Sequence, residues 1–345
     1  MKKLSKITAI ILALVLTLSL GMQAFAATPA EMSASLSTWL KANVKVADTP
    51  EDELDGFLDW TVFALSRAGI TDLNADYAAY IEKAAAANAG NMDLAAYARL
   101  ALTRIAAGQN PRNIGGVNAI SKILNTRYDE EVFTAPLAYA LMALGSRGYF
   151  AISQRLDIID ILLASQRANG GFNYALVDDG SGFTTDGDVD TTAIVLQALA
   201  PYYRYNNKVT IAVNDALAFI KSETLPDGGY GFFGMGSAET TAQVLTALCE
   251  LKIDPLSSAY ISSEGKNMID ALSTYINPDG GGRSYDGSSN IMTSYQMLMG
   301  VTAYDRYQNG SRTLFNITDA TGSLDLIFAT VGRIIFHAIF NSIFK

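Results

Sequence analysis

The chain has almost none of the residues on which many catalytic and metal sites depend. Among its 345 residues there is one cysteine, Cys249, and one histidine, His337, which lies near the C-terminus. A single cysteine forms no internal disulfide. The helical region also lacks the ligands for a zinc site with Asp, Cys and His, and it lacks the histidine of a Ser-His-Asp or Cys-His catalyst. Cys249 lies in an apolar run, which is typical of a buried, inert thiol. We therefore expect no metal and no cofactor.

Tryptophan and positive charge are also scarce. Trp39 and Trp60 are the only tryptophans, although 17 tyrosines and 15 phenylalanines are present. The 34 acidic residues outnumber the 25 basic ones, and an acidic surface disfavours nucleic acid as a partner. Half of the residues are hydrophobic, which is enough for a large core without disulfides.

The N-terminus has the three parts of a bacterial secretion signal. Lysines within the first six residues precede an apolar run over 7–20, and Ala24-Phe25-Ala26 is a small-residue cleavage site. The apolar run is short, which disfavours a retained membrane anchor. We therefore expect a signal peptide at 1–26 and a secreted or cell-surface bacterial protein.

Apolar residues recur at helical spacing from Pro29 to Tyr307, and no stretch alternates with the period of a strand. The pattern predicts twelve helices, at about 29–46, 54–69, 74–88, 92–107, 114–127, 131–146, 151–168, 190–204, 208–223, 238–252, 263–276 and 290–307. Alternate helices align on a column of threonines at Thr61, Thr134, Thr192, Thr241 and Thr293.

A repeated helix pair predicts hairpins that stack side by side. Small residues beside the threonine column would let the second helix of each pair approach a common axis. Wider apolar faces, such as 158–163, would place the first helices outside. We therefore expect an all-α fold, an α6/α6 toroid over 27–308. An open superhelix of helix pairs is the alternative.

Glycine-rich loops precede the later inner helices at 169–172, 227–233 and 279–282. The stretch from Gln166 to Phe172, QRANGGF, resembles the Q-x-x-x-G-x-W repeat of squalene and terpene cyclases, with Phe172 in place of Trp. DVDTTA at 188–193 is similar to their D-x-D-D-T-A motif. The region from about 29 to 307 thus resembles the prenyltransferase and squalene-cyclase α/α-toroid superfamily. This resemblance implies the fold; an activity has to be argued from the site.

The two aspartates of this motif have two interpretations. In the cyclases the middle aspartate protonates the substrate, and the residue match would make Asp190 a general acid and Asp188 its partner in a class II terpene-cyclase-like enzyme. Thr191 replaces the third aspartate, and two tryptophans offer little for a cation-stabilising cavity. The residues alone favour Asp190 as the N-terminal cap of the next helix, with a ligand role added. We therefore favour binding over catalysis, and the enzyme remains the alternative.

The aspartates of the same loop also suggest a calcium-binding site. Asp186, Asp188 and Asp190 have the spacing of the first EF-hand ligands, but Thr191 and Gln197 stand where that calcium loop needs Gly and Glu. The EF-hand is thereby excluded, and a calcium site of another kind is left open.

A closed ring would bring the starts of its inner helices together at one rim. Carboxylates and aromatic residues near those starts would line this rim: Asp188, Asp190, Glu239, Tyr174, Phe183, Tyr230, Phe232, Phe233 and Tyr285. The arrangement predicts binding of a small molecule or a surface partner. If the aromatic residues fill the ring instead, the chain is a structural cell-surface module.

The C-terminal part has a different composition. Residues 309–323 are polar and turn-rich, which indicates a linker. Residues 324–345 are apolar, with Arg333, His337 and Asn341 on one helical stripe. A charge in mid-membrane is costly, so we expect an amphipathic helix (324–344) on a membrane surface or a partner rather than a span. Packing on the toroid is the alternative.

Overall fold

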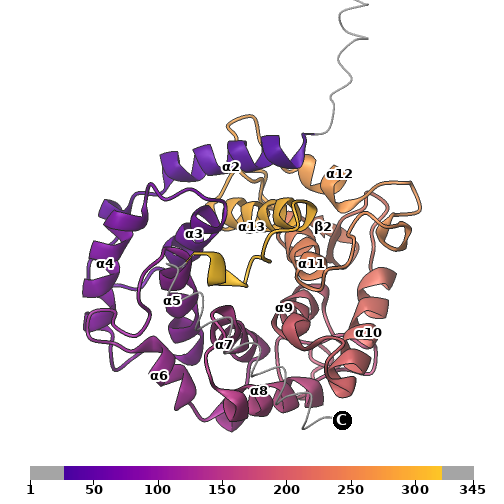
Figure 1. Cartoon of the computed structure of the whole chain (residues 1–345). Coiled ribbons are helices and arrows are strands. Elements are labelled where there is room, and N and C mark those ends of the chain that lie inside the picture. Colours follow the sequence, from indigo (N-terminus) through magenta and orange to yellow (C-terminus); the bar gives the residue numbers. More distant parts are fainter. Residues whose placement is uncertain (1–26, 321–345) are drawn as a thin grey trace, which may run out of the picture.

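The computed structural model describes residues 27–320, which form two concentric rings of helices (Figure 1). The inner ring consists of α3 (Gly56–Arg67), α5 (Leu94–Ala106), α7 (Thr134–Ser146), α9 (Val189–Leu199), α11 (Ala238–Glu250) and α13 (Ile291–Gln308). The outer ring consists of α2 (Pro29–Asn43), α4 (Asn74–Ala87), α6 (Ala119–Leu124), α8 (Ile152–Ala164), α10 (Asn207–Ser222) and α12 (Met268–Ser273). Short 3₁₀ turns lie between helices at Val46–Asp48, Tyr128–Glu130, Ala200–Tyr202 and Ser258–Tyr260, and a fifth, Ile317–Asp319, follows α13.

The inner ring is closed. Each inner helix packs on the next, and α13 packs on α3. The predicted α6/α6 toroid is therefore confirmed, and the open superhelix is excluded. The predicted signal peptide (1–26), the apolar tail (324–345) and the end of the predicted linker lie outside the described residues. Within 27–320, each helix is too short or too polar to cross a bilayer.

Small residues set the spacing of the inner helices, as the sequence predicts. A side chain added at Gly300 of α13 would lie 3.0 Å from the Cβ of Ala242 on α11. The backbones of α11 and α13 thus meet where both residues are small.

The glycine-rich loops are copies of one turn. Gly170, Gly228 and Gly280 have φ values of +86°, +84° and +92°, in the left-handed region that favours glycine. After each turn a backbone N–H donates to a hydroxyl on the following inner helix: Phe172 to Thr192 at 2.8 Å, Tyr230 to Thr241 at 2.9 Å, and Gly282 to Ser294 at 2.9 Å. The threonine column is thus displaced by one residue in α13, where Ser294 and not Thr293 makes this contact.

One loop contains strands that the sequence does not predict. β1 (Tyr230–Phe232) pairs antiparallel with β2 (Met235–Ser237), with Tyr230 opposite Ser237. The turn residues Phe233 and Gly234 both have positive φ, +51° and +77°, as in the tight turns that suit hairpins. Strands of three residues are too short to give a period-two pattern, which explains why the chain was expected to be helical apart from loops.

The segment 309–320, which we call the strap, crosses the end of the ring at which the inner helices finish (Figure 1, gold). The sequence indicates a polar linker here, but Leu314 and Ile317 are fully buried and Phe315 stacks on Phe63 of α3 with ring centroids 5.3 Å apart. Three apolar side chains within a polar stretch are enough to dock it on the ring. The described part of the predicted linker is therefore a packed cover.

Candidate functional site

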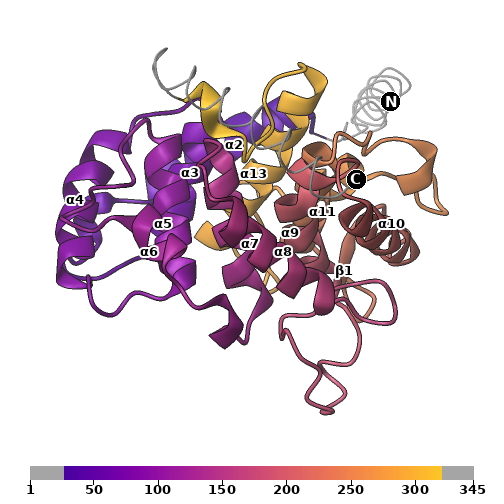
Figure 2. The ribbon, with the colours of Figure 1, turned by 60° about the horizontal axis from the view of Figure 1, so that its bottom comes forward.

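The inner helices all begin at one end of the ring, which we call the mouth. The loop that precedes α9 projects from this end (Figure 2). The opposite end is covered by the strap. The mouth therefore combines free helix N-termini with the loops that the sequence singles out.

Asp188, and not Asp190, caps α9. Asp188 Oδ1 accepts a hydrogen bond from the backbone N–H of Thr191 at 2.7 Å, and the helix starts at Val189. The interpretation of Asp190 as the cap is therefore wrong, because the helix begins one residue earlier than the apolar pattern indicates. Asp190 lies in the first turn, and its carboxyl group is left for another role.

Asp190 and Glu239 occupy the same position, the second residue, of the neighbouring helices α9 and α11. Each carboxyl group lies next to a threonine of the next inner helix. Thr240 of α11 lies next to Asp190, and Thr293 of α13 donates its hydroxyl to Glu239. Glu239 also accepts from Ser237 Oγ at 2.9 Å. The repeat thus places two carboxyl groups side by side at the mouth.

The surroundings of Asp190 shift its titration. Burial, together with the charges of Asp188 and Glu239, raises the pKa of Asp190 to about 7. Burial also raises the pKa of Asp188. Asp190 can therefore gain or lose a proton near neutral pH, which a general acid or a pH-dependent binding group requires.

Aromatic residues lie inside the ring below the carboxyl groups. A cavity of about 30 Å³, which we call the axial cavity, is lined by Trp60, Tyr139, Tyr295 and Phe315 of the strap. The Trp60 and Tyr139 rings are 5.2 Å apart. The cavity also has an amide lining, in which Gln197 donates to Gln243 Oε1 at 2.7 Å and Gln243 donates to Gln296 Oε1 at 3.1 Å. This volume accommodates about one water molecule.

A larger hollow adjoins the same residues. It has a volume of about 720 Å³ and lies between the segment from Asn43 to Leu58 and the start of α13. Trp60 and Tyr295 line both this hollow and the axial cavity. The hollow falls in the size range of small-molecule sites.

Arg99 of the inner helix α5 is a cation near the mouth, but it forms an ion pair with Asp59. Arg99 Nε lies 2.7 Å from Asp59 Oδ2, and Tyr77 donates its hydroxyl to Asp59 Oδ1 at 2.6 Å. Asp59 is fully buried; burial raises its pKa, and Arg99 partly offsets this. Arg99 therefore does not neutralise Asp190 and Glu239, and the mouth stays acidic.

The aromatic residues predicted at the rim do not share one environment in the structure. Tyr230 is fully buried and its hydroxyl lies 3.0 Å from Thr224 Oγ1, so its ring supports the β1–β2 hairpin. The others are exposed on the loops of the mouth: Tyr174, Phe183, Phe232, Phe233 and Tyr285. None of these residues lines the axial cavity or the adjoining hollow.

Sequence reasoning missed Trp60, Tyr139 and Tyr295. The signal available was a bulky aromatic residue inside an inner helix that otherwise carries small side chains towards the axis. Among residues 27–320, no group of three or more His, Cys, Asp or Glu side chains is arranged to hold a metal ion.

No protein-family model matches the sequence, and no curated protein matches it. Solved structures match the fold at low identity. A type II terpene cyclase from Scytonema has a TM-score of 0.57 and 13% identity, covering 81% of this chain and 99% of its own. The unsaturated glucuronyl hydrolase from Bacillus sp. GL1 has a TM-score of 0.56 and 13% identity, covering 82% of this chain and 96% of its own. The protein geranylgeranyltransferase-I of Candida albicans has a TM-score of 0.55 and 10% identity, covering 90% of this chain and all of its own. At these identities the likeness shows the fold alone, and the chain is therefore an α/α toroid built like the terpene cyclases, glucuronyl hydrolases and prenyltransferases.

Proposed function

We propose that the protein is an exported bacterial toroid that binds a small ligand at the mouth. The observation that carries this proposal is that the charges of Asp190 and Glu239 both act on Tyr295, which together with Trp60 lines the hollow of about 720 Å³. Aromatic surface with a few convergent polar groups is the usual composition of a ligand site. The exposed aromatic residues of the loops would contact the outer part of the ligand or a surface partner.

The charge of the mouth selects among ligands. Asp188, Asp190 and Glu239 repel anions, and Arg99 is already paired with Asp59. An anionic sugar is therefore disfavoured, although a glucuronyl hydrolase has the same fold. A neutral or cationic ligand that donates hydrogen bonds to the carboxyl groups and stacks on Trp60 suits the site.

A second candidate is an acid catalyst of the terpene-cyclase kind, and the pKa of Asp190, about 7, favours it. A carboxyl group that stays protonated up to neutral pH can donate a proton. The axial cavity of about 30 Å³ does not hold an isoprenoid, so this activity would require the substrate to sit in the adjoining hollow.

The test is native mass spectrometry of the full-length protein purified from its own cells, comparing wild type with Asp190→Asn and Glu239→Gln. We expect a co-purifying small molecule whose occupancy falls at least about tenfold in both variants, since each loses a charged hydrogen bond. Asp160→Asn, on the exposed face of α8, is the control and should retain it. Equal occupancy in all four proteins would exclude the mouth as the site. Unreacted substrate retained by Asp190→Asn, where wild type holds its chemically altered product, would favour the catalyst.

A further inference from the structure

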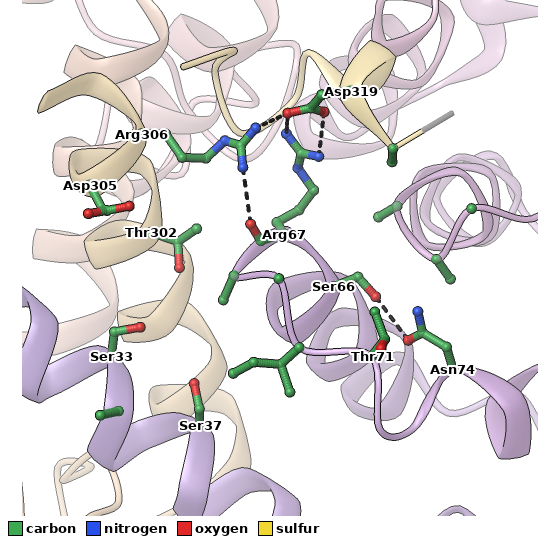
Figure 3. A pocket seen from close by; sticks show the side chains of 18 of the residues that line it. Ser33, Ser37, Ser66, Arg67, Thr71, Asn74, Thr302, Asp305, Arg306 and Asp319 are labelled. Atoms are coloured by element: carbon green, nitrogen blue, oxygen red, sulfur yellow. Dashed lines mark hydrogen bonds and ion pairs between the residues drawn. The ribbon is translucent and has the colours of Figure 1, made fainter. Parts of the chain in front are cut away.

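The end of the ring opposite the mouth holds a separate pocket of about 670 Å³ (Figure 3). It lies between the first half of α2, the ends of α3 and α5, the last turns of α13 and the strap. Its lining has no aromatic residue and few large apolar ones. Hydroxyl groups instead come from three helices and from the loop between α3 and α4: Ser33, Ser37, Ser66, Thr302 and Thr71.

The charged side chains of this pocket are already paired. Arg67 and Arg306 both bind Asp319, and Arg67 also donates to the carbonyls of Leu314 and Thr313. Asp305 accepts from the side chain of Asn309 at 3.0 Å. The two arginines and the two aspartates give the pocket no net charge, and both guanidinium groups already bind Asp319, so no unpaired cation is left for an anionic ligand.

Two hydroxyls in the wall have no partner. Ser37 on α2 and Thr302 on α13 are 3% and 5% exposed, and neither hydroxyl oxygen makes a hydrogen bond within the described chain. Figure 3 shows both on the side of the open space between α2, α13 and the end of α3. A buried hydroxyl without a partner destabilises a fold, so such groups call for a bound molecule or for water.

We propose that this pocket binds a small, neutral, polyhydroxylated molecule of the size of a mono- or disaccharide. A sugar hydroxyl both donates and accepts, as does each serine and threonine of the wall, so the same group can satisfy Ser37 and Thr302. Neutrality follows from the paired charges, and the volume lies in the range of small-molecule pockets. The site is independent of the mouth, since the two share no residue.

The test uses the double variant Ser37→Ala/Thr302→Val in the full chain. Glucose, maltose and myo-inositol are the neutral probes, and sodium glucuronate is the charged one. Isothermal titration should show at least one neutral probe binding to wild type, at least tenfold more tightly than glucuronate. The double variant should bind that probe at least tenfold more weakly, because it lacks two hydrogen bonds.

The double variant should still fold, because both changes replace an unpartnered hydroxyl by an apolar group of similar shape. A loss of binding can therefore be assigned to the pocket. Its Tm without ligand should equal or exceed that of wild type, and its ligand-induced rise in Tm should be lost. Thr61→Val is the matched control, because Thr61 is a buried, unpartnered hydroxyl outside the pocket. It should keep the ligand response. If no neutral probe binds, or if the double variant binds as wild type does, the pocket is only a water-filled hollow and the proposal is overturned.

Discussion

Arg67 and Asp319 form a two-point ion pair, in which Arg67 Nη1 and Nη2 lie 2.8 Å and 3.3 Å from the two carboxylate oxygens of Asp319. The pair joins the end of the first inner helix to the end of the strap. The Arg67 side chain is 3% exposed, so water does not replace this contact when it is lost. The strap is therefore part of the folded ring.

Replacement of Arg67 by Met should destabilise the protein by about 1–3 kcal/mol, because it leaves the Leu314 and Thr313 carbonyls without a donor, whereas Asp319 keeps Arg306 as a partner. Urea unfolding of both proteins measures the difference. Lys83→Met is the control. It breaks the exposed pair with Glu51 and should cost less than about 1 kcal/mol. Equal losses in the two variants would contradict a structural role for the strap.

Asp190→Asn should change how stability depends on pH. The folded state raises the pKa of Asp190 from 3.8 to about 7, so it holds this proton when the unfolded chain has lost it. The charged carboxylate therefore costs stability progressively as pH rises from about 4 to 7. The variant should match wild type near pH 4 and become more stable than wild type above pH 7, on the order of 1.4 kcal/mol for each unit of pKa shift.

Urea unfolding across this pH range tests the prediction, with Asp160→Asn on the exposed face of α8 as the control. This change should stay within about 0.5 kcal/mol of wild type at every pH. A stability difference for Asp190→Asn that does not vary with pH would show that the group titrates normally.

Phe315→Ala should cost about 3–5 kcal/mol, since it removes a buried aromatic ring that stacks on Phe63 and closes the axial cavity. Thermal and urea unfolding provide the value. Phe233→Ala, at a phenylalanine that is 94% exposed, should stay within about 0.5 kcal/mol of wild type. A small effect at Phe315 would mean that the strap does not insert into the ring in solution.

Thr241→Val should cost about 1–3 kcal/mol, because the buried N–H of Tyr230 loses its acceptor. Thr246→Val on the same helix is the matched control. Its hydroxyl only adds a bond to the carbonyl of Ala242, so its loss should cost less. If the two variants unfold at the same urea concentration, the repeated hydroxyl does not hold the glycine turn.

The sequence predicts the double ring because one pattern recurs along it: helical spacing, small residues on alternate helices and a glycine turn before the later ones. It predicts the mouth only in outline. Asp190 and Glu239 occupy equivalent positions on adjacent inner helices, but the neighbouring Trp60, Tyr139 and Tyr295 lie on separate helices and have no common spacing. The strap was missed because Leu314, Phe315 and Ile317 are buried only through contacts with α3 and its neighbours, which a local pattern does not contain.

Ring closure has a consequence for how such a protein can change. In an open stack of helix pairs, units can be added or lost, and the terminal units need polar outer faces. Here α13 packs on α3, so there is no terminal unit, and removal of one pair would leave the remaining pairs unable to meet at the same radius. The number of pairs is therefore constrained by geometry. Variation is left to the loops at the two ends, so an acidic end and a hydroxyl-lined end can diverge independently.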